Sequence, residues 1–250
     1  MRAIDRHAWD NRWRDWHPAE KGLPALGLLL VTLTLPPLTT SLLVLGAITL
    51  ATVWGARVSW AALLGVLAAP LLFLTLGLPF LALSVAFTPG FTVHLSADSF
   101  QLALTTALRS LAAMSCLAFL ILTTPLSDGV ALLRRAGIPA GLIELMLLMY
   151  RLIFVFAEYA LNGVQAQTAR LGYSRPDRSV RSLGLLAGNL FQRALQQARR
   201  LEIGLAARGY DGALRVLTPP QRLSWLRLAV GLGGVGLIGA AGSLLAHAGL

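Results

Sequence analysis

Charge, sulfur and lysine are all scarce in this chain of 250 residues. Only 13% of its residues are charged, whereas soluble domains average about 25%. Cys116 is the one cysteine, which excludes a disulfide framework and a cysteine-based metal site. Lys21 is the one lysine and does not follow a glycine, so the chain has no phosphate loop of the Gly-Lys type.

Clusters of catalytic side chains are also lacking. The long apolar runs hold no carboxylate, which argues against a membrane-embedded hydrolase or a proton relay. The glycines at 231–242 resemble a phosphate loop only superficially, because they lie in an apolar run where small residues permit close helix packing. No His-Glu-x-x-His occurs, and no metal-ligand spacing relates the four histidines, which are His7, His17, His94 and His247. We therefore expect neither an enzyme nor a metal site.

Long apolar runs account for most of the chain. Its residues are 56% hydrophobic, and its mean hydropathy of +0.69 indicates an all-α integral membrane protein. Pro36-Pro37 divides an uncharged run, because proline breaks a helix interior. A span needs about 20 residues. We predict about five spans, with an irregular or re-entrant piece from 80 to 97; the spans lie near 20–35, 38–55, 60–79, 103–123 and 224–248.

Arginine is distributed unevenly. Residues 159–227 contain 11 arginines and three acidic residues, a net charge of +8. The positive-inside rule therefore places 125–227 in the cytoplasm, and it explains the net charge of +10 better than nucleic-acid binding does. With the N-terminus inside, five spans leave the C-terminus outside, provided that 140–160 does not cross. If 140–160 crosses, residues 58–97 must hold two spans.

The first 21 residues mix five basic and four acidic side chains, unlike a secretory signal. Trp9, Trp13 and Trp16 recur at the spacing of one helix face, and tryptophan favours the membrane–water boundary. We predict an interfacial helix at 3–16, ended by His17-Pro18.

Between the fourth and fifth spans the pattern becomes amphipathic. A short helix is predicted at 126–135. In 140–172, Glu144, Arg151 and Glu158 recur every seven residues and so share one face. Charges in mid-membrane cost about 2.5–3.5 kcal/mol each, so this helix is expected to pack on protein or lie near the interface, with the three charged residues supporting it. A second helix, at about 180–208, has an apolar face and a basic face.

Two similar signatures end these helices: Ala169-Arg170-Leu171-Gly172-Tyr173 and Ala207-Arg208-Gly209-Tyr210. Arginine is favoured at a helix C-terminus by the dipole, and a following glycine supplies the left-handed cap. The alanine lets the helix end approach a partner, whose carboxylates the arginine can pair with bidentately. We predict that two partner sites bind these ends, through Ala169, Arg170, Gly172, Ala207, Arg208 and Gly209.

The chain resembles the transmembrane (T) component of energy-coupling factor (ECF) transporters over nearly its whole length. The resemblance rests on Thr123-Thr124-Pro125, on Leu132-Leu133-Arg134-Arg135-Ala136-Gly137-Ile138-Pro139 and on both signatures. Ile4-Asp5-Arg6-His7-Ala8-Trp9 and His17-Pro18-Ala19-Glu20-Lys21 are similar to the cobalt-type branch, CbiQ. The first signature departs from the Ala-Arg-Gly pattern, because Leu171 separates Arg170 from Gly172.

This resemblance implies a multi-pass subunit of the bacterial inner membrane that couples two ABC ATPase subunits to cobalt or nickel import. The ATPases would bind ATP and magnesium, while this chain would hold no cofactor. A substrate-binding (S) subunit of the CbiM type and a small accessory subunit are the other implied partners. The implied domains are 1–125 (membrane), 126–223 (cytoplasmic coupling helices) and 224–250 (last span). The alternatives are a membrane-embedded enzyme, such as a lipid-modifying transferase, and a self-sufficient permease.

Overall fold

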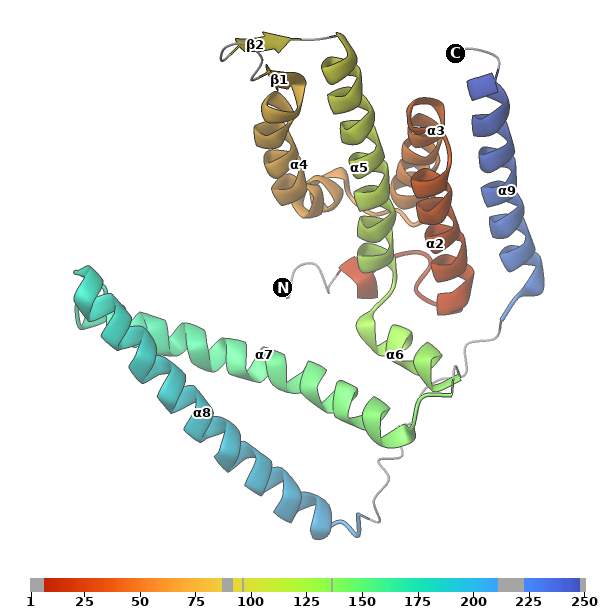
Figure 1. Ribbon diagram of the computed structural model, residues 1–250. Helices are drawn as coiled ribbons and strands as arrows, with labels where there is room; N and C mark the ends of the chain where they lie inside the picture. Colours follow the sequence, from red (N-terminus) through yellow and green to blue (C-terminus); the bar gives the residue numbers. More distant parts are fainter. Residues whose placement is uncertain (1–6, 87–91, 96, 136, 211–222, 248–250) are drawn as a thin grey trace. The chain divides into compact units, whose positions relative to one another are not determined.

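The computed structural model describes residues 7–86, 92–95, 97–135, 137–210 and 223–247 (Figure 1). They form two compact units, and each is described separately. The first unit comprises residues 1–129 and 219–250, and the second comprises residues 130–218. Helices dominate both units, so the chain is an all-α integral membrane protein apart from one short hairpin.

The first unit is a bundle of long apolar helices. Their contacts run mainly from α5 to α3 and α4, and from α2 to α5 and α9. The bundle comprises α2 (Pro18–Thr34), α3 (Pro37–Leu50) with its π-helical extension η1 (Ala51–Gly55), α4 (Trp60–Ala82), α5 (Ala97–Thr123) and α9 (Trp225–His247). The predicted break at Pro36-Pro37 is confirmed, and Arg109 of α5 donates to the Leu35 carbonyl there at 2.9 Å.

Five described helices are long and apolar enough to cross a membrane. This number agrees with the prediction, but the sets differ. Ala140–Ala169 is among the five, and α2 is not, because it has only 17 residues.

The core of the bundle lies where α5 meets its neighbours. Small residues of α5, Ala112 and Cys116, are fully buried against apolar residues of α2 and α3 such as Val44. Gly242 of α9 approaches α3 so closely that an added Cβ would lie 2.5 Å from the Thr40 hydroxyl oxygen. Close approach through small residues is the usual way that helices associate in membranes.

The predicted interfacial helix at 3–16 is wrong over its described part. Residues 7–9 are helical, but residues 10–16 form turns. Trp13 stacks on Trp16 at 4.6 Å between ring centroids, and it packs edge-on against Phe119 of α5 at 5.9 Å. Trp13 therefore packs on the bundle. Its ring lies so close to Gly55 that a Cβ added to Gly55 would be 2.4 Å from the ring.

The segment after α4 is also more regular than predicted. α4 continues through Pro79 to Ala82, and an antiparallel hairpin follows, with β1 (Leu83–Ala86) paired to β2 (Thr92–Leu95). A two-stranded ladder satisfies backbone donors and acceptors that an irregular segment would leave unpaired. Residues 87–91 lie outside the described part.

The second unit consists mainly of two long helices, α7 (Ala140–Ala169) and α8 (Pro176–Ala206), which pack against each other. The predicted short helix is confirmed as α6 (Leu126–Arg135), and the division between the two units falls within it. Both long amphipathic helices were predicted, and their ends agree with the predicted ends within a few residues.

The cytoplasmic orientation of 125–223 stays a prediction and can be tested by thiol labelling. Cysteines introduced at Ser174 or Gln196, both exposed, should resist an impermeant reagent in right-side-out vesicles. A cysteine at the exposed Thr34, at the end of α2 that the same prediction places outside, should react and serves as the positive control. Cys116 is buried and contributes little background. Ready labelling at both Ser174 and Gln196 would show that the predicted orientation is wrong.

Candidate functional site

The two predicted signatures lie at the ends of the two helices of one hairpin. α7 ends at Ala169, and α8 begins at Pro176 after a connection of residues 170–175. Arg175 is extended, as expected before proline, and Pro176 suits the first position of a helix. Asp177 in the first turn complements the helix dipole. The sequence thus fixes where the chain reverses.

The end of α7 has the hydrogen bonds of a Schellman motif. The Gly172 N–H donates to the Gln167 carbonyl at 2.8 Å, and the Leu171 N–H donates to the Thr168 carbonyl at 3.0 Å. Leu171 occupies the left-handed position with φ 57°. Arg170 directly precedes it.

The end of α8 repeats this pattern. The Tyr210 N–H donates to the Leu205 carbonyl at 3.0 Å, and the Gly209 N–H donates to the Ala206 carbonyl at 3.1 Å. Gly209 occupies the left-handed position with φ 72°, and Arg208 directly precedes it. Arg170 and Arg208 therefore have equivalent positions, although their sequence motifs differ by one residue.

The prediction that each glycine supplies the left-handed cap is therefore correct for Gly209 and wrong for Gly172. Gly172 stands one residue later, where close packing excludes a side chain. An added Cβ would lie 2.9 Å from the Gln167 carbonyl oxygen and 2.8 Å from the Ser182 hydroxyl oxygen. Leucine in the left-handed region costs roughly 1–2 kcal/mol, and the first helix end tolerates this cost.

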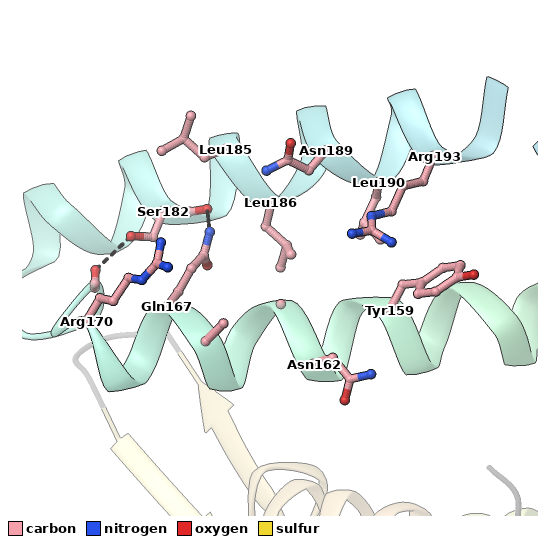
Figure 2. Close-up of a pocket in the computed structure, with 13 residues that line it drawn as sticks. Tyr159, Asn162, Gln167, Arg170, Ser182, Leu185, Leu186, Asn189, Leu190 and Arg193 are labelled. Carbon is pink, nitrogen blue, oxygen red and sulfur yellow. Dashed lines mark hydrogen bonds between the residues drawn. The ribbon is translucent and has the colours of Figure 1, made fainter. Parts of the chain in front are cut away.

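Polar contacts that the sequence did not predict close the hairpin beside Arg170 (Figure 2). The Gln167 side-chain amide donates to the Ser182 carbonyl at 2.9 Å, and the Ser182 hydroxyl donates to the Gly172 carbonyl at 2.9 Å. The Tyr173 hydroxyl donates to the Gln167 side-chain oxygen at 2.6 Å. These bonds hold the connection against α8, so Arg170 projects from a fixed base.

Two substitutions test this cap. Leu171→Gly should raise the free energy of unfolding of the hairpin by about 1 kcal/mol, because it removes left-handed strain. Gly172→Ala should lower it, because its methyl group meets a backbone carbonyl. Thermal unfolding of the purified variants measures both. Gly184→Ala, at an exposed helical site with nothing near its Cβ, is the control for Gly172→Ala and should instead raise the free energy of unfolding, because glycine is unfavourable in a helix interior. A stability gain from Gly172→Ala like that from Gly184→Ala, or no gain from Leu171→Gly, would contradict the assignment.

A polar groove runs along one side of the hairpin between α7 and α8. Arg170 lines one end, Arg193 lies farther along with its guanidinium 5.0 Å from the Tyr159 ring centroid, and Arg200 lines the continuation. Asparagine and glutamine supply most of the remaining polar lining, and no carboxylate is among the described lining residues. Figure 2 shows Arg170 and Arg193 at opposite ends of the view. This side of the hairpin is suited to an acidic partner surface.

The other side of the hairpin is apolar. Helical geometry of 3.6 residues per turn places a row of exposed residues on each helix away from the groove. On α7 these are Met146, Ile153 and Val164, and on α8 they are Leu183, Phe191 and Leu195. The hairpin is therefore two-sided, with one face for polar partners and one for apolar surroundings.

The charged stripe of α7 has one direct link to a signature. Glu144, half-buried, accepts a hydrogen bond of 3.5 Å from the hydroxyl of Tyr210, which follows Gly209. Arg151 and Glu158 are exposed on the same helix. The end of α8 is thus tied to the beginning of α7. The supporting role of the stripe stays a prediction.

Metal-binding geometry is not found in the described part of the chain, where no cluster of three or more histidine, cysteine or carboxylate side chains could hold an ion.

Four of the predicted docking residues are exposed, as residues that bind a partner must be: Ala169, Arg170, Ala207 and Arg208.

Comparison with known proteins places this arrangement in a family. The family model described as "Cobalt transport protein", CbiQ, matches residues 10–220. A cobalt transport protein CbiQ of Rhodobacter capsulatus is 42% identical over 97% of this chain and 98% of its own length. The corresponding protein of Salmonella typhimurium is 30% identical over 85% of this chain and 98% of its own length.

The name of a third relative describes a fusion of CbiM and CbiQ in one polypeptide. The putative fused cobalt transport protein CbiMQ of Methanocorpusculum labreanum is 34% identical over 50% of this chain, which corresponds to 21% of that protein. The family match and the two near-complete relatives agree with the membrane helices and the paired helix ends. The chain therefore belongs to the CbiQ family of cobalt transport proteins and is a multi-pass membrane protein.

Proposed function

We propose that this chain is the coupling (T) subunit of an ECF-type ABC importer for cobalt or nickel. In this role it links two ATPase subunits to a substrate-binding membrane subunit, and it has no catalytic activity of its own. The observation that carries the proposal is the equivalence of Arg170 and Arg208. Two caps with the same hydrogen-bond pattern, each presenting an exposed arginine, fit two copies of the same kind of acidic pocket.

The two-sided hairpin gives each partner its own surface. The groove lined by Arg170, Arg193 and Arg200 lacks carboxylates among its described residues and suits the acidic surface of an ATPase. The apolar side, with Ile153 and Phe191 exposed, suits a membrane-embedded partner. A relative fused to a CbiM sequence supports a partner of the CbiM type.

Isolation of the complex tests the proposal directly. Tagged chain expressed with candidate ATPase and CbiM-type subunits should retain both on purification, with two ATPases for each tagged chain. Metal uptake in vesicles should then require ATP. Uptake by the purified chain alone would instead establish a self-sufficient permease.

A further inference from the structure

Two oppositely charged residues lie side by side in the first turn of α2 and are almost completely buried. Glu20 is 5% exposed and Lys21 is 2% exposed. A charge removed from water destabilises a fold unless it is paired and hydrogen-bonded. Their partners therefore show what these two residues hold in place.

Lys21 holds the end of α5. Its ammonium donates to the Thr123 carbonyl at 2.9 Å and to the Trp13 carbonyl at 2.9 Å. Thr123 is the last residue of α5, where carbonyls have lost their helical partners. The Asn11 side-chain amide donates to the same Thr123 carbonyl at 3.3 Å. An N-terminal turn and α2 thus fix the point where α5 ends.

Glu20 holds the beginning of α9. Its Oε1 accepts a hydrogen bond of 2.6 Å from the Ser224 N–H, and Ser224 immediately precedes α9. The Ser224 carbonyl accepts from the Leu228 N–H at 3.1 Å, which makes Ser224 the residue that starts the helix. A carboxylate is favoured there by the helix dipole. Arg227 lies 3.7 Å from Glu20 Oε2 and covers the Trp16 ring at 4.6 Å.

These two positions flank the second unit in the sequence. The chain passes from the bundle to residues 130–218 shortly after Thr123, and it re-enters the bundle shortly before Ser224. A third contact lies just before the exit, where Arg14 of the N-terminal turn pairs with Asp128 of α6. All of these contacts lie within the first unit.

We propose that Glu20 and Lys21 are positioning residues that clamp both junctions to α2, so that displacement of the coupling hairpin moves the bundle helices instead of bending the junctions. This inference rests on the proposed coupling function. It assigns a transport role to the N-terminal turn and the first turn of α2, which contain none of the predicted docking residues.

The first experiment measures the clamp in the purified chain and so does not depend on the ATPases. Spin labels at the exposed Leu50 and Leu126, in a Cys116→Ala background, report the distance between α3 and the start of α6, just before the exit. Lys21→Met should broaden the distance distribution. Thr32→Val is the matched control, because Thr32 is fully buried in α2 and bonds only to the Leu28 carbonyl of its own helix. Distance distributions of equal width in Lys21→Met and Thr32→Val would overturn the proposal that Lys21 clamps the junction.

The second experiment measures coupling in the complete complex. Lys21→Met and Glu20→Leu should assemble with the ATPases and hydrolyse ATP, while cobalt uptake per ATP falls about fivefold or more, the lower range of measured coupling effects. Glu20→Gln retains an oxygen for the Ser224 N–H and should restore most of the ratio. An unchanged ratio in assembled complexes would overturn the transport role.

The outcomes separate the two proposals. If the double variant Arg170→Glu/Arg208→Glu loses the ATPases but Lys21→Met keeps its uptake ratio, only the clamp is wrong. If this double variant retains the ATPases, the coupling function itself is wrong, whatever the labels report. If both Lys21→Met and Glu20→Leu fail to fold while Glu20→Gln transports normally, the two residues serve folding alone and the positioning role is rejected.

Discussion

The double variant Arg170→Glu/Arg208→Glu is expected to insert normally and to lose both ATPase subunits. Each arginine is exposed at the end of a long helix, so its reversal leaves the hairpin fold intact. Removing one partner of a buried, hydrogen-bonded charge pair across an interface costs about 2–5 kcal/mol, roughly 30-fold or more in affinity. Reversal adds repulsion, so each single variant should bind weakly and the double variant should not bind.

Pull-down of the ATPases with the tagged chain measures this effect. Arg199→Glu is the matched control, since it places the same charge on an exposed part of α8, outside both the caps and the groove lining. It should retain the ATPases. Recovery of the ATPases at wild-type level with the double variant would refute the docking role of both helix ends.

Insertion of Gly-Gly after Gln196 is expected to uncouple ATP hydrolysis from metal uptake. The insertion softens α8, because each glycine costs about 1 kcal/mol relative to alanine in a helix interior. It also turns everything beyond it by about 200°, since each residue adds about 100°. Arg208 then points in a different direction relative to the residues of α8 that face α7. Docking through Arg170 should preserve assembly, while uptake per ATP falls.

An Ala-Ala insertion at the same place separates the two effects. It shifts the register equally but keeps the helix stiff. The Ala-Ala variant, whose helix stays stiff while Arg208 is displaced, should lose binding at the second site. The Gly-Gly variant should in addition transmit less force along α8. Uptake per ATP is measured in proteoliposomes that contain all subunits. If both insertions leave this ratio unchanged, the helices only tether the ATPases and do not act as levers.

Apolar periodicity and proline positions were enough to predict most of the helices. The break at Pro36-Pro37, the short helix at 126–135 and the two long amphipathic helices all follow from local physics, because proline lacks the amide hydrogen and polar faces repeat at the helical period. Basic residues at helix ends likewise pointed to Arg170 and Arg208.

Long-range packing accounts for what the sequence could not predict. Trp9, Trp13 and Trp16 have helical spacing, yet Trp13 packs on Gly55 and Phe119, which are far away in the sequence. Glycine is the usual left-handed cap, but Ser182 leaves Gly172 no room for a side chain, and the left-handed position falls to Leu171. The sequence could not predict what Lys21 binds, because its partner Thr123 lies 102 residues away.

The burial of Lys21 also has a consequence for experiments on the assembled transporter. Amine-directed reagents need a solvent-accessible, unprotonated amine, and the only side-chain amine of this chain is 2% exposed with two carbonyl partners. Lysine cross-linkers applied to the native complex will therefore attach to the partners and leave the lysine of this subunit unmodified. Mapping its contacts in the complex requires carboxylate, arginine or engineered-cysteine chemistry, and the appearance of a Lys21 adduct would itself report that the bundle has opened.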